Sequence, residues 1–266
     1  KDGTFLSEDR LNSEAGRILR RLCEGGSVLA VAADMEKAVV LRDFGNGETS
    51  RAAVVDRAVA ELRSTGTAAP VHGCVCHVGR AEDRERLRGE VARLWGPFGF
   101  DIFVSNAAVN PTVESVLEIG EATLDKMIDV NLKSALLLTQ ALAPMLRDSG
   151  AVLYVSSVLA YRPAAPLGFY GVTKTALLGL TQAVAQELGP RGVRVNCLAP
   201  GIVPTKFSAA LVRDPDAARA QADRTLLQRL GTPEEIAGAA AFLCSDDAAY
   251  VTGETLVAAG GMHARL

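Results

Sequence analysis

The sequence has little histidine and little cysteine, and both shortages exclude classes of site. Three histidines among 266 residues leave little material for a His-rich metal centre or a catalytic set built on histidine. The five cysteines are an odd number, and Cys74 and Cys76 form C-x-C with no second pair to complete a zinc site. We therefore expect reduced cysteines and no metal, with chemistry that rests on other residue types.

Strong net charge and long apolar runs are also missing. The 28 basic and 31 acidic side chains leave a formal net charge of −3, so net charge gives no reason to expect binding to nucleic acid. Charged or polar residues interrupt the apolar runs well before about 18 positions, so we expect no membrane span. The sequence starts at Lys1 without a basic-then-apolar leader, so we expect no secretory signal and a natural start that lies elsewhere.

Short β-branched runs alternate with longer helical stretches, which predicts an α/β protein with a parallel sheet and helices on both faces. The predicted strands are 71–76, 101–105, 151–156, 193–199 and 254–257, and their apolar character predicts central, buried positions. The predicted helices are 51–64, 81–95, 124–146, 170–188 and 233–244. No proline-rich or serine-rich linker divides the chain, so we expect one domain, with residues 208–228 as a helical lid over a site.

Tyr170 and Lys174 stand four residues apart at the head of a predicted helix, so their side chains lie on one face. A lysine cation beside a phenol lowers the pKa of the phenol, which suits an acid and base near neutral pH. A simple contact on a helix surface would have the same spacing. The pair alone therefore leaves both interpretations open.

Two further polar residues stand where an apolar residue would be ordinary. Ser157 follows an apolar strand, which places its hydroxyl where open α/β sheets bind ligands. Asn131 interrupts an otherwise apolar helix, and we expect it to order water behind Lys174. The alternatives are a strand-end cap for Ser157 and a buried hydrogen-bonding residue for Asn131.

This set resembles the short-chain dehydrogenase/reductase family, which uses Ser, Tyr, Lys and Asn on a Rossmann-type sheet for hydride transfer with a nicotinamide cofactor. The resemblance places Ser157, Tyr170, Lys174 and Asn131 at the four catalytic positions. It implies a doubly wound parallel sheet in a single domain. It also implies that Lys174 holds the hydroxyls of the nicotinamide ribose, while the tyrosine proton meets the alkoxide.

Other segments extend the resemblance toward the cofactor. Asn106–Ala107–Ala108 resembles the family's Asn–Ala–Gly turn beside the adenine ribose. Pro200–Gly201–Ile202 with Thr205 resembles the segment that holds the nicotinamide amide. Arg51, preceded by serine, resembles the arginine that pairs with a 2′-phosphate, which implies NADPH rather than NADH.

Within the family, four stretches resemble the peroxisomal dehydrogenase/reductase member 4 group of carbonyl reductases: 76–79, 105–111, 172–181 and 194–201. This resemblance implies ketones, aldehydes, dicarbonyls or retinoids as substrates, and a homodimer or homotetramer packed through helices 124–146 and 170–188. The ending Ala264–Arg265–Leu266 has the small–basic–leucine form of a peroxisomal address read by an import receptor. We expect a peroxisomal protein; if the ending is an ordinary terminus, we expect a cytoplasmic one.

Residues 1–50 depart from the family pattern, so we divide the chain into this atypical segment and a domain from 51 to 266. The family's T-G-x-x-x-G-x-G turn lets backbone N–H groups approach the pyrophosphate. An alignment on residues 18–26 puts Glu8, Asp9, Ser13 and Ala15 there instead. A second candidate, residues 45–50, fits either G-x-G-x-x-S or a solvated Asn–Gly turn.

Two explanations for this departure remain. The stretch derives from a different upstream exon or an erroneous gene model, which we favour, or the nucleotide loop has been lost. The second explanation would make the chain a pseudoenzyme or a binding module with impaired cofactor binding.

Overall fold

A computed structural model describes residues 28–31, 60, 72–96, 99–205, 207–212 and 214–262. Five parallel strands lie in the order β1 (Val28–Val31), β2 (Phe100–Ser105), β3 (Leu146–Val155), β4 (Arg194–Pro200) and β5 (Thr255–Ala258). The α-helices are α4 (Ala81–Trp95), α5 (Glu121–Ile128), α6 (Ser134–Leu142), α7 (Gly168–Leu188), α8 (Pro215–Ala222) and α9 (Pro233–Cys244). None of these helices combines the length and the apolar character that crossing a membrane requires.

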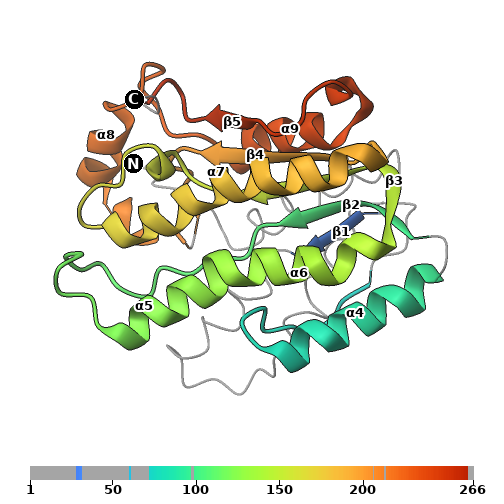
Figure 1. Cartoon of the computed structure of the whole chain (residues 1–266). Coiled ribbons are helices and arrows are strands. Elements are labelled where there is room, and N and C mark those ends of the chain that lie inside the picture. The colour runs from blue at the N-terminus through green and yellow to red at the C-terminus, as the bar shows by residue number, and fades with distance from the viewer. Residues whose placement is uncertain are drawn as a thin grey trace.

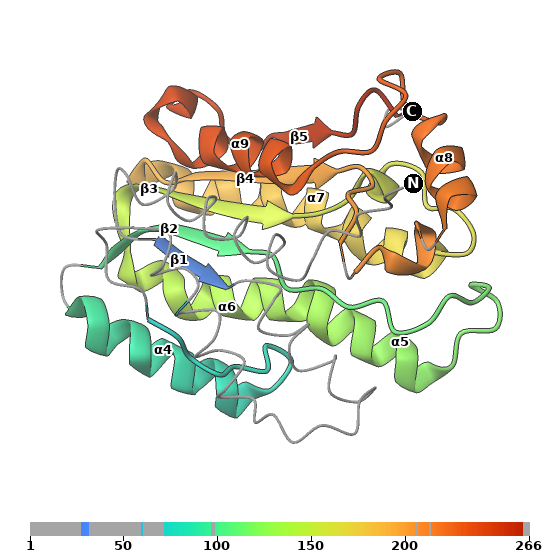
Figure 2. The same cartoon turned by 180° about the vertical axis from the view of Figure 1, so that it is seen from behind.

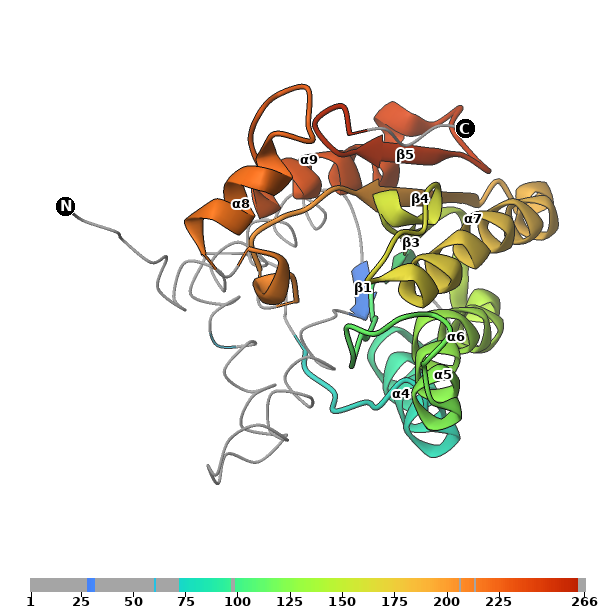
Figure 3. The same cartoon turned by 90° about the vertical axis from the view of Figure 1, so that its left-hand side faces the viewer.

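Helices cover both faces of the sheet, as predicted. Figure 1 shows α6 and α7 in front of the strands, and Figure 2 shows α9 on the opposite face. The period-2 alternation of β2 divides its side chains between the two layers. Phe103 belongs to the core cluster that includes Leu138 of α6 and Leu177 of α7, whereas Ile102 belongs to the cluster with Leu243 of α9. Figure 3, turned a quarter from Figure 1, shows the same layers from the side.

Strand β5 is less central than the sequence predicts. We expected 254–257 to be buried in the middle of the sheet, but β5 pairs with β4 at the edge of the described sheet. Its side chains are only half-buried, and Leu256 is exposed. The prediction failed because a run of apolar residues does not reveal how many neighbours a strand has.

Residues 72–76, expected to belong to a strand at 71–76, form no strand in the described structure, and neither does His77. Residue 71 lies outside the described structure. Side chains of α4 bind the backbone of this segment. Arg86 donates to the carbonyl of Val75 at 2.5 Å, and the Asp83 carboxylate accepts from the His77 N–H at 2.7 Å. These side chains satisfy backbone groups that a neighbouring strand would otherwise bind.

The predicted helix 124–146 is interrupted in the structure. Helix α5 already starts at Glu121, and a π-helical turn over Asp129–Lys133 separates it from α6. A 3₁₀ turn over Ala143–Met145 then ends the helical stretch, and Leu146 is the first residue of β3. Periodicity alone did not reveal the π turn, because the apolar face continues through it.

The predicted lid is partly helical. The residues after β4 form a 3₁₀ turn over Ala209–Leu211 and then helix α8. Proline at the first position of α8 and the Asp214 carboxylate, which accepts from the Ala217 N–H at 2.8 Å, start this helix. In Figure 1, α8 lies at the same end of the molecule as the start of α7.

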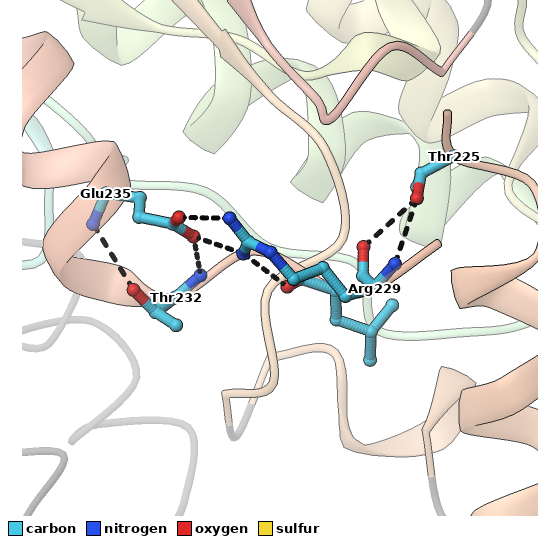
Figure 4. A network of polar contacts seen from close by, with 5 residues as sticks. Thr225, Arg229, Thr232 and Glu235 are labelled. Atoms are coloured by element: carbon cyan, nitrogen blue, oxygen red, sulfur yellow. Dashed lines mark hydrogen bonds and ion pairs between the residues drawn. The ribbon is translucent and has the colours of Figure 1, made fainter. Parts of the chain in front are cut away.

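A network of polar contacts joins the end of the lid to the start of α9 (Figure 4). Thr232 caps the helix and exchanges hydrogen bonds with Glu235, whose carboxylate accepts from Arg229 at 2.9 and 2.6 Å. Thr225 Oγ1 in turn contacts the backbone N–H and C=O of Arg229 at 3.2 and 3.1 Å. The Arg229 guanidinium and the backbone N–H of Thr232 lower the pKa of Glu235 to about 2.

We expect Glu235→Gln to lower the free energy of unfolding at pH 7 by about 0.2–1 kcal/mol, the usual range for an exposed ion pair. Glutamine can keep the capping contact with one oxygen. It removes the charge and replaces the second oxygen, which accepts from Arg229, by a donor. Because the pKa of Glu235 is lowered, its stabilisation is present above the ordinary pKa of 4.5 and is lost as pH falls through about 2. Urea unfolding at several pH values should therefore show the difference from wild type shrinking below pH 4.5.

The exposed Glu187 of α7 provides a matched control. Glu187→Gln should leave the unfolding midpoint unchanged. A Glu235→Gln effect of equal size at pH 7 and near pH 2 would contradict the electrostatic explanation.

Candidate active site

Three strands deliver candidate residues to one edge of the sheet. Strands β2, β3 and β4 are parallel neighbours, so their carboxyl ends lie together. Asn106 follows β2, Ser157 lies just beyond β3, and Gly201 follows β4. This is the edge at which open α/β sheets bind ligands, as the sequence predicts.

Helix α7 packs closely against the segment that follows β3. A Cβ atom on Gly171 would lie 2.8 Å from Pro163 Cβ, so the approach requires glycine. Thr175 Oγ1 also donates to the carbonyl of Ala160 at 2.6 Å. These contacts fix the first turns of α7, and with them Tyr170, against the exit of β3.

Ser157 both caps a turn and contacts the phenol of Tyr170. Its Oγ accepts from the Leu159 N–H at 3.2 Å at the start of the 3₁₀ turn Val158–Ala160, so the capping interpretation is confirmed. Its hydroxyl also forms a hydrogen bond with Tyr170. The two interpretations of this serine are therefore compatible.

The pKa of Tyr170 shifts upward, opposite to the expectation from the sequence. Burial raises it above its ordinary value of 10, and the hydrogen bond with Ser157 lowers it by less. The prediction from the sequence considered only the charge of Lys174, which lowers the pKa of the phenol. It left out burial, which removes water from the phenol and raises its pKa. In the free protein the phenol is consequently protonated at neutral pH.

Lys174 lies beside the phenol with its side chain buried. Its Nζ donates to the carbonyl of Val155 at 2.8 Å and stands 5.6 Å from the centre of the Tyr170 ring. Ser156 Oγ donates to the backbone carbonyl of Lys174 at 2.8 Å, which ties α7 to the end of β3. A buried ammonium needs such partners, and its location next to the ring agrees with the predicted pair.

Asn131 forms a bridge between three segments. Its Oδ1 accepts from the Val109 N–H at 2.7 Å, and its Nδ2 donates to the Val109 carbonyl at 2.9 Å and to Thr173 Oγ1 at 3.1 Å. The side chain thus binds protein groups, as the buried hydrogen-bonding alternative predicted. That Asn131 also orders water behind Lys174 stays a prediction. The π-helical turn around Asn131 is a feature often found at functional sites.

The sequence reasoning missed several residues that shape this site. Thr173 receives the Asn131 contact and donates to the backbone carbonyl of Tyr170 at 2.7 Å. Its position between the tyrosine and the lysine was a usable signal. Val109 acts through its backbone and Phe207 through its ring, and neither type of contact leaves a local pattern in the sequence.

The segment after β4 continues along the same edge. Gly201 donates to the Ala258 carbonyl at 2.9 Å, and a Cβ on Gly201 would lie 2.8 Å from Ala259 Cα. The carbonyl of Ile202 accepts from Gly231 at 3.2 Å. These contacts hold the expected cofactor segment beside β5. Pro200 is the last residue of β4, and the buried Ala107 and the partly buried Thr205 flank the same edge.

Other predicted features lie outside the described residues. These are Arg51, the proposed division of the chain at residue 50, both candidate pyrophosphate loops and the ending Ala264–Arg265–Leu266.

Comparisons with known proteins identify the family. The family model described as Enoyl-(Acyl carrier protein) reductase matches residues 27–263. Human Dehydrogenase/reductase SDR family member 4 is 49% identical over 214 residues, which cover 80% of this chain and 76% of that protein. The chain belongs to the short-chain dehydrogenase/reductase family. Its fold is the family's Rossmann-type parallel sheet in a single domain.

Relatives in this family extend the match along the chain. Tropinone reductase-like 3 of Erythroxylum coca is 47% identical over 212 residues, which cover 80% of each protein. Dehydrogenase/reductase SDR family member 4 of Rattus norvegicus is 40% identical over 251 residues, covering 94% of this chain and 83% of that protein. The family match therefore starts before residue 50 and includes β1.

Solved structures in the family agree with the fold. A short-chain dehydrogenase/reductase from Serratia marcescens has a TM-score of 0.76 at 26% identity, covering 94% of this chain and 93% of that one. A blue fluorescent protein from a metagenomic library, in complex with NADPH, has a TM-score of 0.74 at 25% identity, covering 88% and 96%.

Proposed function

We propose that this protein reduces carbonyl compounds to alcohols by hydride transfer, with NADPH as the hydride donor. The observation that carries the proposal is the convergence of three side chains at the carboxyl edge of the sheet. The Ser157 hydroxyl contacts the Tyr170 phenol, and Lys174 Nζ stands 5.6 Å from the centre of the phenol ring. Relatives named as reductases and a related structure in complex with NADPH support it.

The donors and acceptors at this edge fit the nicotinamide half of such a cofactor. An ammonium and a phenol suit ribose hydroxyls, and backbone groups with a hydroxyl suit a carboxamide. We assign the ribose to Tyr170 and Lys174. We assign the carboxamide to Pro200, Gly201, Ile202 and Thr205, and the adenine ribose to Asn106 and Ala107. When bound, NADPH supplies the hydride.

The side chains divide the remaining work. The hydroxyls of Ser157 and Tyr170 both hold the carbonyl oxygen of the substrate and polarise it. Tyr170 then gives its proton to that oxygen, and burial keeps this proton in place beforehand by raising the pKa of the phenol. The Lys174 cation stabilises the phenolate that remains. Asn131 acts as a positioning residue, because it ties Thr173 of α7 to the backbone of Val109.

The test is NADPH oxidation by the purified chain with a panel of aromatic ketones, aldehydes, α-dicarbonyls and retinal. We expect oxidation that depends on at least one of these carbonyl compounds. No oxidation with any member of the panel would overturn the proposal. The panel also separates the substrate classes that the family resemblance implies.

The second candidate function is a pseudoenzyme or binding module of the same fold. The absence of a glycine-rich turn at residues 8–15 of the sequence favours it, because the acidic Glu8 and Asp9 stand at two of the four motif positions. A titration that follows fluorescence quenching on NADPH addition distinguishes the two functions. Saturation at micromolar cofactor supports the enzyme, whereas no response below millimolar cofactor supports the binding module.

We expect Arg51→Ala to lower kcat/KM for NADPH by about 10–100-fold, the value of one charge-assisted contact to a phosphate. The value for NADH, which lacks the 2′-phosphate, should change little. Steady-state kinetics with each cofactor at a fixed ketone concentration measure the ratio. Arg57→Ala, farther along the same predicted helix, is the matched control. Equal losses with both cofactors would contradict this role for Arg51.

We further propose that the chain forms a homodimer or homotetramer and is delivered to peroxisomes. Leu136 of α6 and Val172 of α7 present exposed apolar side chains, which supports assembly through these helices. The import receptor would read Ala264–Arg265–Leu266. Each proposal concerns a surface or an ending separate from the catalytic side chains.

A further inference from the structure

An aromatic ring from the loop after β4 lies against the phenol of Tyr170. The ring centres of Phe207 and Tyr170 are 5.5 Å apart and their planes meet at 47°, within the favourable range for aromatic pairs. Phe207 is 37% exposed, whereas Tyr170 is 7% exposed. The ring of Phe207 is therefore partly exposed to solvent, and it lies against a buried phenol.

The backbone beside Phe207 is anchored. The neighbouring Ser208 is buried, and its Oγ accepts from the Thr205 N–H at 3.0 Å and donates to the carbonyl of Val203. The 3₁₀ turn Ala209–Leu211 follows directly. The loop after β4 thus presents Phe207 to the site from a fixed point.

Each element packed around the phenol contributes a different kind of group. Helix α7 contributes the ammonium of Lys174, the segment after β3 contributes the neutral hydroxyl of Ser157, and the loop after β4 contributes the ring of Phe207. Lys174 is the charged and titratable group that faces the phenol in the described structure. Removal of the Phe207 ring leaves the lysine and the serine in place and changes the access of water.

We propose that Phe207 is a positioning residue that keeps water off the phenol of Tyr170 and directs its hydroxyl toward Ser157. The inference rests on the proposed function, in which this hydroxyl holds the carbonyl oxygen and gives up its proton. A water molecule at the phenol would compete with both partners. By excluding water, the ring of Phe207 keeps the Tyr170 hydroxyl available to donate its proton to the substrate.

The test compares Phe207→Ala with Phe207→Leu, which retains apolar bulk, and with Phe242→Ala as a matched control. Phe242 is 40% exposed and lies near the end of α9. The backbone carbonyl of the next residue, Leu243, accepts from Arg194 at the start of β4. Phe242 therefore lies near the amino-terminal ends of the strands, opposite the candidate site. Circular dichroism confirms that each variant is folded.

The first measurement is nitration of Tyr170 by tetranitromethane in the free protein, followed by peptide mass spectrometry. We expect Phe207→Ala to increase the nitration rate several-fold. Phe207→Leu should stay near the wild type, and Phe242→Ala should have no effect. This measurement needs neither cofactor nor turnover.

The second measurement is the pH profile of kcat/KM for carbonyl reduction with NADPH. Burial raises the pKa of Tyr170, so admitting water moves it back down. The protonated phenol is then lost earlier as pH rises, and the alkaline fall in activity should shift about one unit lower in Phe207→Ala. We also expect kcat to fall more than KM rises, because the ring acts on the proton donor.

The outcomes separate the inference from the proposed function. Unchanged nitration of Tyr170, or an unchanged alkaline limb in Phe207→Ala, overturns the role of Phe207. A wild type that oxidises no NADPH with any ketone overturns the proposed function. In that case the nitration rate still decides whether Phe207 shields Tyr170.

Discussion

Tyr170→Phe should lower the rate of carbonyl reduction by about 10²–10⁴-fold, the usual contribution of a positioned acid. The substitution removes the hydroxyl that contacts Ser157 and would give its proton to the substrate. The remaining ring can still pack against Phe207, and Thr173 still donates to the backbone carbonyl at residue 170. We therefore expect an intact fold with a melting temperature near that of the wild type.

Steady-state kinetics with NADPH and one reduced ketone test this expectation. Tyr250→Phe is the control, because Tyr250 is fully exposed. The control should keep wild-type turnover. If Tyr170→Phe also keeps it, Tyr170 is not the proton donor.

Lys174→Met should lower kcat/KM by about 10²-fold or more, because the phenolate loses the nearby positive charge. Methionine retains much of the aliphatic volume of the buried lysine stem. The carbonyl of Val155 loses the donor at 2.8 Å, which should also cost about 1–3 kcal/mol of stability. Binding of NADPH should weaken as well, because Lys174 is assigned to the nicotinamide ribose.

Fluorescence titration with NADPH and single-turnover kinetics separate the two effects of this substitution. Lys126→Met, at an exposed position of α5, is the matched control. We expect the control to alter neither quantity. A Lys174→Met variant that is less stable but binds NADPH and reduces ketones normally would reduce Lys174 to a structural role.

Local signals in the sequence predicted the ends of two helices. Helices α4 and α9 have the predicted ends, Ala81–Trp95 and Pro233–Cys244. For α9, Thr232 supplies the cap and Pro233 the preset first position. The same reasoning could not reveal the π turn around Asn131, because the polar partners of this residue are distant in sequence.

In the site, too, the sequence predicted the features of a single helix and missed those that depend on contacts between distant segments. The four-residue spacing of Tyr170 and Lys174 is a property of one helix, so the sequence was sufficient to place the two side chains together. The direction of the tyrosine pKa depends on burial, and the Phe207 ring from the loop after β4 belongs to that burial. Such a contact depends on tertiary packing and has no periodic pattern. The edge position of β5 was missed for the same reason.

The parallel sheet also determines when the site can form during synthesis. Parallel neighbours cannot be joined by a tight hairpin, so each strand pair waits for an intervening crossover. Strand β3 pairs with β4, and α7 with Tyr170 and Lys174 lies between them in the chain. A nascent chain that ends before Arg194 therefore carries the tyrosine and the lysine but leaves β3 without this neighbour. Such an intermediate exposes an apolar strand edge on the ribosome, which makes it a natural client for chaperones.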